Sequence, residues 1–202
     1  METGKLAASQ WPAGAPMVEY DLVRGEDDVA QILDLQRINH RYAVDAATGQ
    51  SQGYTTVQHD PETLSAMNRR YPSVVARSEG KVVGYCLMMA QEFRDRIPVL
   101  MPMFRMLDTL DWREQPLAGN PRWFVMGQVC VAEAYRAMGV FDGMNHHLRE
   151  SYADRFDMTI TEVSSANPRS LRAHRRVGFQ TMHVYDDPEA DEMWEVVIWD
   201  WR

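Results

Sequence analysis

The sequence predicts an α/β domain built on a mixed β-sheet, and three observations point to this fold class. Segments with the alternation or apolar runs of strands are interspersed with segments whose apolar residues recur at helical spacing. Some strands are joined by short turns typical of antiparallel hairpins, whereas others are separated by helices, as parallel neighbours require. A length of 202 residues with 45% apolar residues suits one domain with a sizeable core, which we expect over residues 17–202.

The chain starts with a predicted strand and helix, after a lead-in over residues 1–16 that we expect to be flexible and that has no apolar stretch of signal-peptide length. Residues 17–25 have the composition of a strand. In residues 27–39, Val29 and Ile32 recur at helical spacing behind two aspartates, which the positive end of a helix dipole favours.

A second helix and a hairpin come next. Residues 60–71 predict the helix, because Asp60 is a good N-cap and Pro61 suits the first helical position. Residues 73–90 predict two apolar strands joined by a glutamate–glycine turn at Gly80.

Residues 91–121 form an insert rich in methionine, proline and large apolar side chains, which is too long and too apolar for a simple loop. Its apolar residues can pack in the core, form a wall of an acceptor site where flexible methionines adapt to a ligand, or form the subunit interface of a homodimer. We favour a mixed arrangement, with core packing beneath and an acceptor wall above.

The strand–turn–helix after the insert is the most informative segment. Residues 122–132 predict a long buried strand, 139–156 a helix with one apolar face, and 158–164 the next strand. The N-terminus of a helix is a prepared anion site, and Gly139 removes a side chain where a phosphate must approach the backbone closely. Taken alone, a plain connecting turn also explains this glycine.

A basic helix and a final hairpin complete the chain. Asn167 is a good N-cap for the helix, Pro168 suits its first position and Gly178 ends it. Residues 179–185 and 193–201 pair across an acidic turn.

The basic helix is unusual in a chain whose net charge is −8. Its charge indicates either a binding patch for an anionic ligand or a solvated face of arginines, and the sequence leaves both open. The arginines concerned are Arg169, Arg172, Arg175 and Arg176.

Composition excludes several other classes of protein. The acidic balance argues against nucleic-acid binding, and no apolar run is long enough to span a membrane. Cys86 and Cys130 lie in apolar runs, so we expect two buried, reduced thiols and a cytoplasmic protein. His146 and His147 are adjacent on a predicted helix and point in different directions, so we expect no metal.

Two motifs together resemble the GCN5-related N-acetyltransferase (GNAT) family. One is V-x-V-x(4)-R-x-x-G-x-F from Val129 to Phe141, and the other is N-P-x(8)-V-G-F from Asn167 to Phe179. In the family, the first contains a pyrophosphate loop written Q/R-x-x-G-x-G/A, and this chain departs from it at Phe141. The order of predicted elements over residues 17–201 also matches the family, apart from the insert.

The resemblance implies acetyl-CoA as co-substrate, bound where the strand at 122–132 splays from the strand at 158–164. Backbone groups of the first strand would pair with the pantetheine arm, loop amides would hold the pyrophosphate, and an arginine of the basic helix would bind phosphate. The residues implied are Val129, Cys130, Val131, Arg136, Ala137, Met138, Gly139, Val140, Phe141, Asn167 and Arg172.

The resemblance also suggests residues for proton transfer. Many family members carry a tyrosine seven residues after the asparagine, which protonates the departing thiolate, and His174 stands there in this chain. A histidine can do this work, although a half-buried packing role explains it equally well. Glu92 and Glu162 are candidates for the base by their chemistry alone.

The predicted function is therefore an acetyl-CoA-dependent N-acetyltransferase that acts on a small-molecule or amino-acid-like amine. The alternative is a non-catalytic acyl-CoA-binding or sensing protein of the same fold. A third hypothesis is the transfer of a bulkier acyl group, for which Phe141 and the methionines would leave room.

Overall fold

The computed structural model describes residues 16–40, 57–188 and 191–202, so nearly all of the predicted lead-in lies outside the described residues. Within them, seven strands form one mixed sheet in the order β1-β2-β3-β6-β7-β9-β8. The neighbours are antiparallel except for β6 and β7, which are parallel. This arrangement confirms the predicted mixed sheet. The strands are β1 (Glu19–Leu22), β2 (Val74–Ser78), β3 (Lys81–Met89), β6 (Trp123–Val131), β7 (Met158–Ser164), β8 (Gln180–Asp187) and β9 (Glu192–Asp200).

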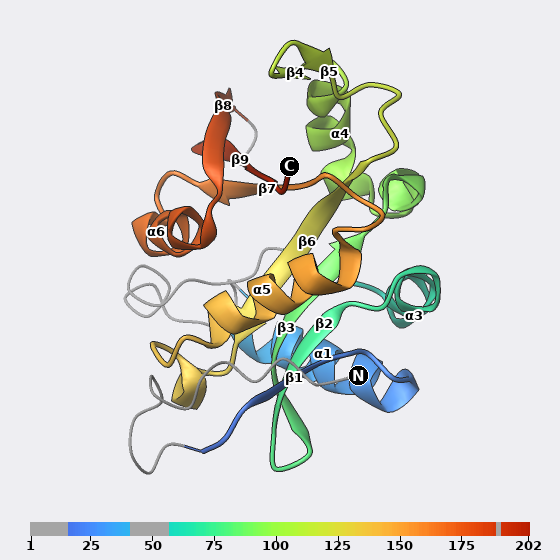
Figure 1. Cartoon of the computed structure of the whole chain (residues 1–202), viewed down its shortest axis with the longest axis vertical. Helices are drawn as coiled ribbons and strands as arrows, with labels where there is room; N and C mark the ends of the chain where they lie inside the picture. Colours follow the sequence, from blue (N-terminus) through green and yellow to red (C-terminus); the bar gives the residue numbers. More distant parts are fainter. Residues whose placement is uncertain (1–15, 41–56, 189–190) are drawn as a thin grey trace.

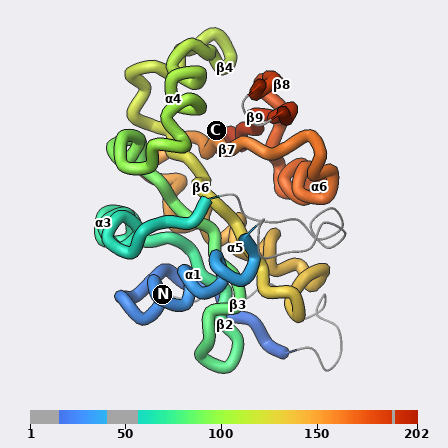
Figure 2. Tube along the Cα trace, turned by 180° about the vertical axis from the view of Figure 1, so that it is seen from behind, coloured from blue at the N-terminus to red at the C-terminus, as the bar shows by residue number. Residues whose placement is uncertain are grey.

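Helices cover both faces of the sheet. In Figure 1, α5 (Val140–Tyr152) lies in front of the sheet and α1 (Glu26–Asn39) behind it, and Figure 2 shows α1 from the other side. The helix α3 (Pro61–Arg70) packs with α1, and α6 (Pro168–Val177) packs beside α5. Because α5 contacts β6 and α6 contacts β7, the two helices lie near the line where these parallel strands meet.

Local sequence signals account for several of the element boundaries. Asp60 caps α3 by accepting a hydrogen bond from the Thr63 amide at 2.8 Å, with Pro61 in the first position. Glu79 and Gly80 both have positive φ, the conformation of a type I′ turn, and they join β2 to β3. The predicted second helix and first hairpin are thus confirmed.

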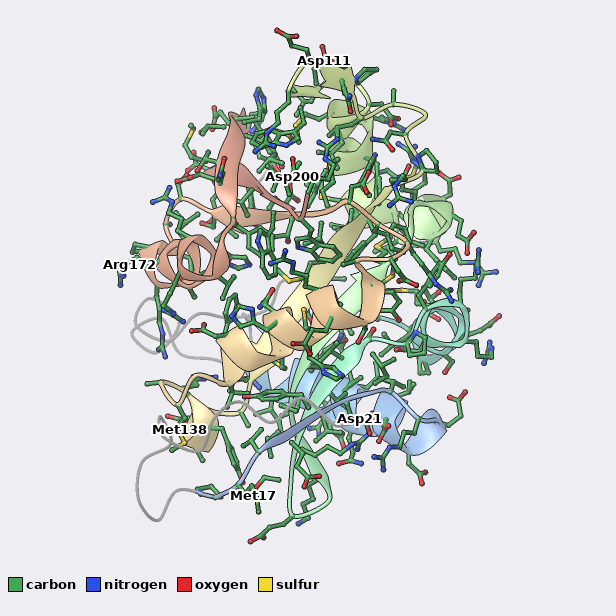
Figure 3. All side chains as sticks on the ribbon, viewed as in Figure 1. Met17, Asp21, Asp111, Met138, Arg172 and Asp200 are labelled. Carbon is green, nitrogen blue, oxygen red and sulfur yellow. The ribbon has the colours of Figure 1, made fainter. Side chains whose placement is uncertain are left out.

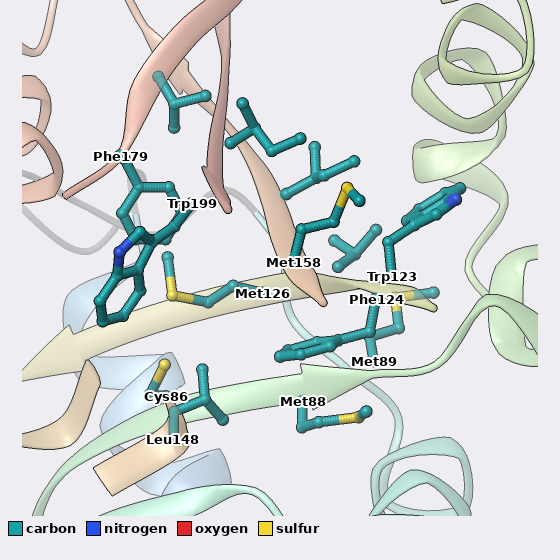
Figure 4. Close-up of a cluster of buried hydrophobic side chains, with 14 of the residues drawn as sticks. Cys86, Met88, Met89, Trp123, Phe124, Met126, Leu148, Met158, Phe179 and Trp199 are labelled. Atoms are coloured by element: carbon teal, nitrogen blue, oxygen red, sulfur yellow. The ribbon is translucent and has the colours of Figure 1, made fainter. Parts of the chain in front are cut away.

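The core lies between the sheet and its helices and also extends into the insert. Figure 4 shows methionines and aromatic rings from β3, β6 and β7 packed together, among them Met88, Trp123, Phe124 and Met158. Phe124 contacts the ring of Phe156 edge to face, with centroids 5.1 Å apart.

The insert has secondary structure of its own. It contains short 3₁₀ turns at Gln91–Arg96 and Pro98–Leu100, the helix α4 (Met101–Leu107) and a small hairpin of β4 (Asp111–Trp112) and β5 (Gln115–Pro116). The hairpin is tied to the end of β9, because the Trp112 indole donates to the Asp200 carboxylate at 2.9 Å. Most of the large apolar residues of the insert are buried, which confirms core packing: Phe93, Ile97, Leu100, Met103, Phe104, Leu107 and Leu117. The acceptor wall and the subunit interface stay predictions.

Candidate functional site

The parallel strands β6 and β7 separate partway along their length. They pair only over the first three residues of each strand, and Val125–Ile160 is the last pair. Beyond it, β6 continues to Val131 paired with β3 alone, while β7 continues paired with β9. Among the described residues, one edge of β6 is therefore without a partner strand, as the resemblance to the GNAT family predicted.

Backbone groups of β6 point toward this open edge. The Ala132 amide donates to the Val83 carbonyl at 2.8 Å, on the side of β3. Because backbone groups alternate in direction along a strand, Val129 and Val131 direct theirs to the opposite edge. The Arg136 side chain donates its Nε–H to the Val131 carbonyl at 3.0 Å, so the Val129 groups are the better placed to pair with a ligand.

The loop that follows β6 leads into the uncapped N-terminus of α5. Gly139 has a φ of 78°, in the left-handed region, and a Cβ built on it meets no described atom within 4 Å. No side chain of the described residues caps α5, and the first helical hydrogen bond runs from the Gly143 amide to the Gly139 carbonyl at 3.0 Å. The amides of residues 140–142 therefore lack intrahelical acceptors, and they form the donor set that an anion needs.

A cavity of about 310 Å³ ends on this loop, between β6, α5 and α6. Every cofactor-binding residue predicted from the resemblance lines it, except Met138. Figure 3 shows Met138 and Arg172 on the same side of the molecule. The predicted residues in the lining are Val129, Cys130, Val131, Arg136, Ala137, Gly139, Val140, Phe141, Asn167 and Arg172.

Six further residues line the cavity that were not predicted to bind the cofactor. Asn39 carried no signal, because only the folded chain brings the end of α1 to this loop, and Tyr135 lies in the loop directly before Arg136. The others lie on α6, where positions 169, 172, 173 and 176 share one helical face. That spacing, together with the basic composition, is a signal that finds Arg169, Ala173 and Arg176 from sequence, whereas it does not find Ser170.

The arginines around the cavity differ in their hydrogen bonds and ion pairs. Arg176 binds both carboxylate oxygens of Asp142, at 2.8 and 2.6 Å, and Arg136 donates to the Asn39 side chain at 2.6 Å. Within the part of the chain that the structure describes, Arg172 has no ion pair or side-chain hydrogen bond. Arg172 is therefore the lining cation most available to a ligand.

His174 lies in the core behind the cavity wall. Only 2% of it is exposed, and its ring packs edge to face against Phe141 and Phe179, with centroids 5.0 Å away in each case. Its Nδ1 atom is 2.8 Å from the Ser170 carbonyl oxygen. Burial lowers the pKa of His174 to about 4, so the ring is neutral near pH 7.

This geometry determines where the proton of His174 resides. A carbonyl oxygen only accepts, so Nδ1 carries the proton that it donates to Ser170. In the neutral ring, Nε2 then has a lone pair and no proton, and it has no hydrogen-bond partner among the described residues. The role of proton donor suggested for His174 stays a prediction, and as placed the ring has no proton on Nε2 to give.

Glu162 lies on β7, two residues beyond its last pair with β6. The Tyr185 hydroxyl on β8 donates to its carboxylate at 2.6 Å. Burial raises the pKa of Glu162, the negative charge of Asp187 acts in the same direction, and the hydrogen bond from Tyr185 opposes them. Glu162 thus has the environment of a carboxylate suited to take up a proton.

The other predicted base, Glu92, has a different environment. It lies in the 3₁₀ turn after β3, half exposed, and its carboxylate is paired with Arg70 at 2.8 Å. It does not line the cavity. The structure therefore brings Glu162, but not Glu92, to the strands that separate.

The two cysteines are free and buried, as predicted. Burial raises the pKa of Cys86 far above its usual range, and it raises that of Cys130 to about 11. Neither thiol is a nucleophile near pH 7.

Among the described residues, no helix is long and apolar enough to cross a membrane. In the same ranges, no group of three or more potential metal ligands comes together.

Comparison with known proteins identifies the fold. No family model and no curated protein matches the chain, but solved structures do. Diaminobutyrate acetyltransferase from Paenibacillus lautus, in complex with L-2,4-diaminobutyric acid and coenzyme A, is 18% identical, with a TM-score of 0.59 over 91% of this chain and 95% of that one. The yncA protein of Salmonella typhimurium, with its cofactor acetyl-CoA, is 14% identical, with a TM-score of 0.60 over 92% and 94%.

A third similar structure is a GNAT-family acetyltransferase from Streptococcus pneumoniae. It is 12% identical, with a TM-score of 0.59 over 90% of this chain and 98% of that one. At such identities, structural likeness speaks for the fold and leaves the chemistry to the site. The strand order, the separation of β6 from β7 and these likenesses agree: the chain has the fold of the GCN5-related N-acetyltransferases.

Proposed function

We propose that the protein is an acetyl-CoA-dependent N-acetyltransferase whose acceptor is a small-molecule or amino-acid-like amine. One observation carries this proposal: the open edge of β6, the uncapped amides of α5 and the available Arg172 converge on a single cavity. Those groups fit the pantetheine arm, the pyrophosphate and a phosphate of acetyl-CoA, respectively. Two of the similar structures hold acetyl-CoA or coenzyme A.

Each part of the site would have a separate task. Bound acetyl-CoA would supply an activated acetyl group at the point where β6 and β7 separate. The Val129 backbone would hold the arm beside β6 and direct its amide at the thioester oxygen, where negative charge develops. Amides from Arg136 to Phe141 would hold the pyrophosphate, and Asn167, which caps α6, would contact the arm.

Glu162 is the proposed base. The acceptor nitrogen must lose a proton to attack the thioester, and Glu162 would accept this proton directly or through water. A carboxylate of raised pKa holds a proton more readily than an exposed one, which suits this role. Tyr185 would keep the carboxylate oriented through its hydroxyl.

The activity test is a screen of amines with acetyl-CoA, following release of free CoA with a thiol reagent. Cys86 and Cys130 are buried with raised pKa values, so the protein itself contributes little background. We expect acetylated product from at least one small amine. Product from none of a broad panel, despite tight binding of acetyl-CoA, would instead support the non-catalytic binding protein, which the unprotonated Nε2 of His174 favours.

Replacing Arg172 with glutamine should weaken acetyl-CoA binding about threefold to tenfold, because one charge-assisted contact with a phosphate is lost. Calorimetry measures this change. Arg155→Gln is the matched control, because Arg155 follows the far end of α5 and does not line the cavity. Equal effects of the two substitutions would contradict a phosphate contact from Arg172.

Replacing His174 with phenylalanine separates packing from proton transfer. Phenylalanine preserves the ring between Phe141 and Phe179, so we expect kcat to stay within about threefold of the wild-type value. A kcat lowered by about 100-fold with an unchanged KM for acetyl-CoA would instead show that His174 donates the proton.

A further inference from the structure

Asp142 places a negative charge close to the proposed pyrophosphate site. It is the third residue of α5, and its own amide is one of those of residues 140–142 that open the helix. A carboxylate in the first turn stabilises the helix itself. It also repels any dianion bound at the same helix end, since charges within one turn are closer than the screening length of about 8 Å at physiological salt.

Arg176 on α6 is the cation that faces this carboxylate. Its guanidinium binds both oxygens of Asp142 in a bidentate pair, which fixes its position and joins α5 to α6. Arg176 lines the cavity, whereas Asp142 does not. The pair therefore presents its positive member to the cavity and holds the negative member away from it.

Tyr20 is an ionisable group beside Asp142, and it does not neutralise the carboxylate. Tyr20 on β1 packs against α5 so closely that a Cβ built on Gly143 would lie 2.1 Å from its ring. Burial and the charge of Asp142 raise the pKa of Tyr20 to about 12, so the phenol is uncharged near pH 7.

We infer that Arg176 is a positioning residue for the cofactor: it neutralises Asp142, so that the helix end can accept the pyrophosphate of acetyl-CoA without repulsion. This inference rests on the proposed function, since it concerns the same cavity. The two arginines on one face of α6 then have different roles: Arg172 binds a phosphate, and Arg176 pairs with Asp142.

A double-mutant cycle in acetyl-CoA affinity tests the inference by calorimetry. Arg176→Gln should weaken binding about tenfold, because it exposes an unpaired carboxylate to the pyrophosphate. Asp142→Asn alone should bind at least as tightly as the wild type. The double variant should return to within about twofold of the wild type, since neither charge remains.

The chain offers a matched control pair one residue along the helix. Arg175 pairs with Glu195 on β9 at 2.8 Å, and neither residue lines the cavity. Arg175→Gln and Glu195→Gln should leave acetyl-CoA affinity unchanged. Side chains of Arg176 and Asp142 are 56% and 28% exposed, so their variants should fold, and thermal melting checks this.

Two results would overturn the inference. If Arg176→Gln weakens binding as much in the Asp142→Asn background as in the wild type, then Arg176 contacts the phosphate itself. If Arg176→Gln has no effect in the wild-type background, then Asp142 needs no neutralisation. Failure of the proposed function looks different, because the wild type itself then shows no binding of acetyl-CoA.

Discussion

Glu162→Gln is expected to lower kcat by about 100-fold or more, because glutamine keeps the shape of the side chain but cannot take a proton from the acceptor amine. The KM for acetyl-CoA should change little, since Glu162 does not line the cavity. Steady-state kinetics with an acceptor found in the amine screen measures both. Glu92→Gln is the control and should retain wild-type kcat, because Glu92 is half exposed and paired with Arg70.

The hydrogen bond from Tyr185 gives this assignment a second readout. A base works in its deprotonated form, so kcat/KM should rise with pH through the pKa of Glu162. The hydroxyl of Tyr185 lowers that pKa, so Tyr185→Phe should move the acidic limb of the profile to higher pH. A limb that stays in place in Tyr185→Phe, or wild-type kcat in Glu162→Gln, would remove Glu162 from the mechanism.

Asp28→Asn is expected to destabilise the fold by about 3–5 kcal/mol, because it leaves the buried guanidinium of Arg77 without its counter-ion. Asp28 and Arg77 are 6% and 9% exposed and form a bidentate pair at 2.8 and 2.5 Å, which joins α1 to β2. The free energy of unfolding from denaturant titration measures the loss. Asp34→Asn is the control, since its pair with Arg37 is exposed and should contribute no more than about 0.5 kcal/mol.

The same pair predicts how stability depends on pH. Burial opposes ionisation of Asp28, but hydrogen bonds from Arg77 and from the Arg24 amide outweigh it and hold its pKa below the usual range. The ionised Asp28 therefore makes its full contribution to stability above the pKa of about 4 that aspartate has in the unfolded chain. This contribution is lost as the pH falls through the lower pKa of Asp28 in the folded protein. In Asp28→Asn, this part of the acid destabilisation should be absent.

Much of the fold could be predicted because its signals are local. The caps at Asp60 and Asn167 and the turn at Gly80 each depend on neighbours in sequence, and the structure has all three. The hairpin inside the insert carried no such signal. It depends on the distant contact of Trp112 with Asp200, which local patterns do not reveal.

In the candidate site, too, local features could be predicted from the sequence and features that depend on tertiary packing could not. The loop residues that the resemblance assigns to the cofactor line the cavity, apart from Met138, since one short motif contains them, and their binding role stays a prediction. The environment of His174 could not be predicted, because Phe141 and Phe179 enclose it only after α5 and α6 pack together. The bond between Glu162 and Tyr185 likewise depends on the pairing of β7, β9 and β8.

The central claim is that the cavity at Gly139 binds acetyl-CoA, and a calorimetric titration of the wild-type protein tests it most directly. We predict binding of one acetyl-CoA per chain, and weaker binding of dephospho-CoA, which lacks a phosphate that the basic face of α6 would attract. If neither acetyl-CoA nor dephospho-CoA gives binding heat, the result would contradict the claim. The protein would then have the fold but bind a different ligand.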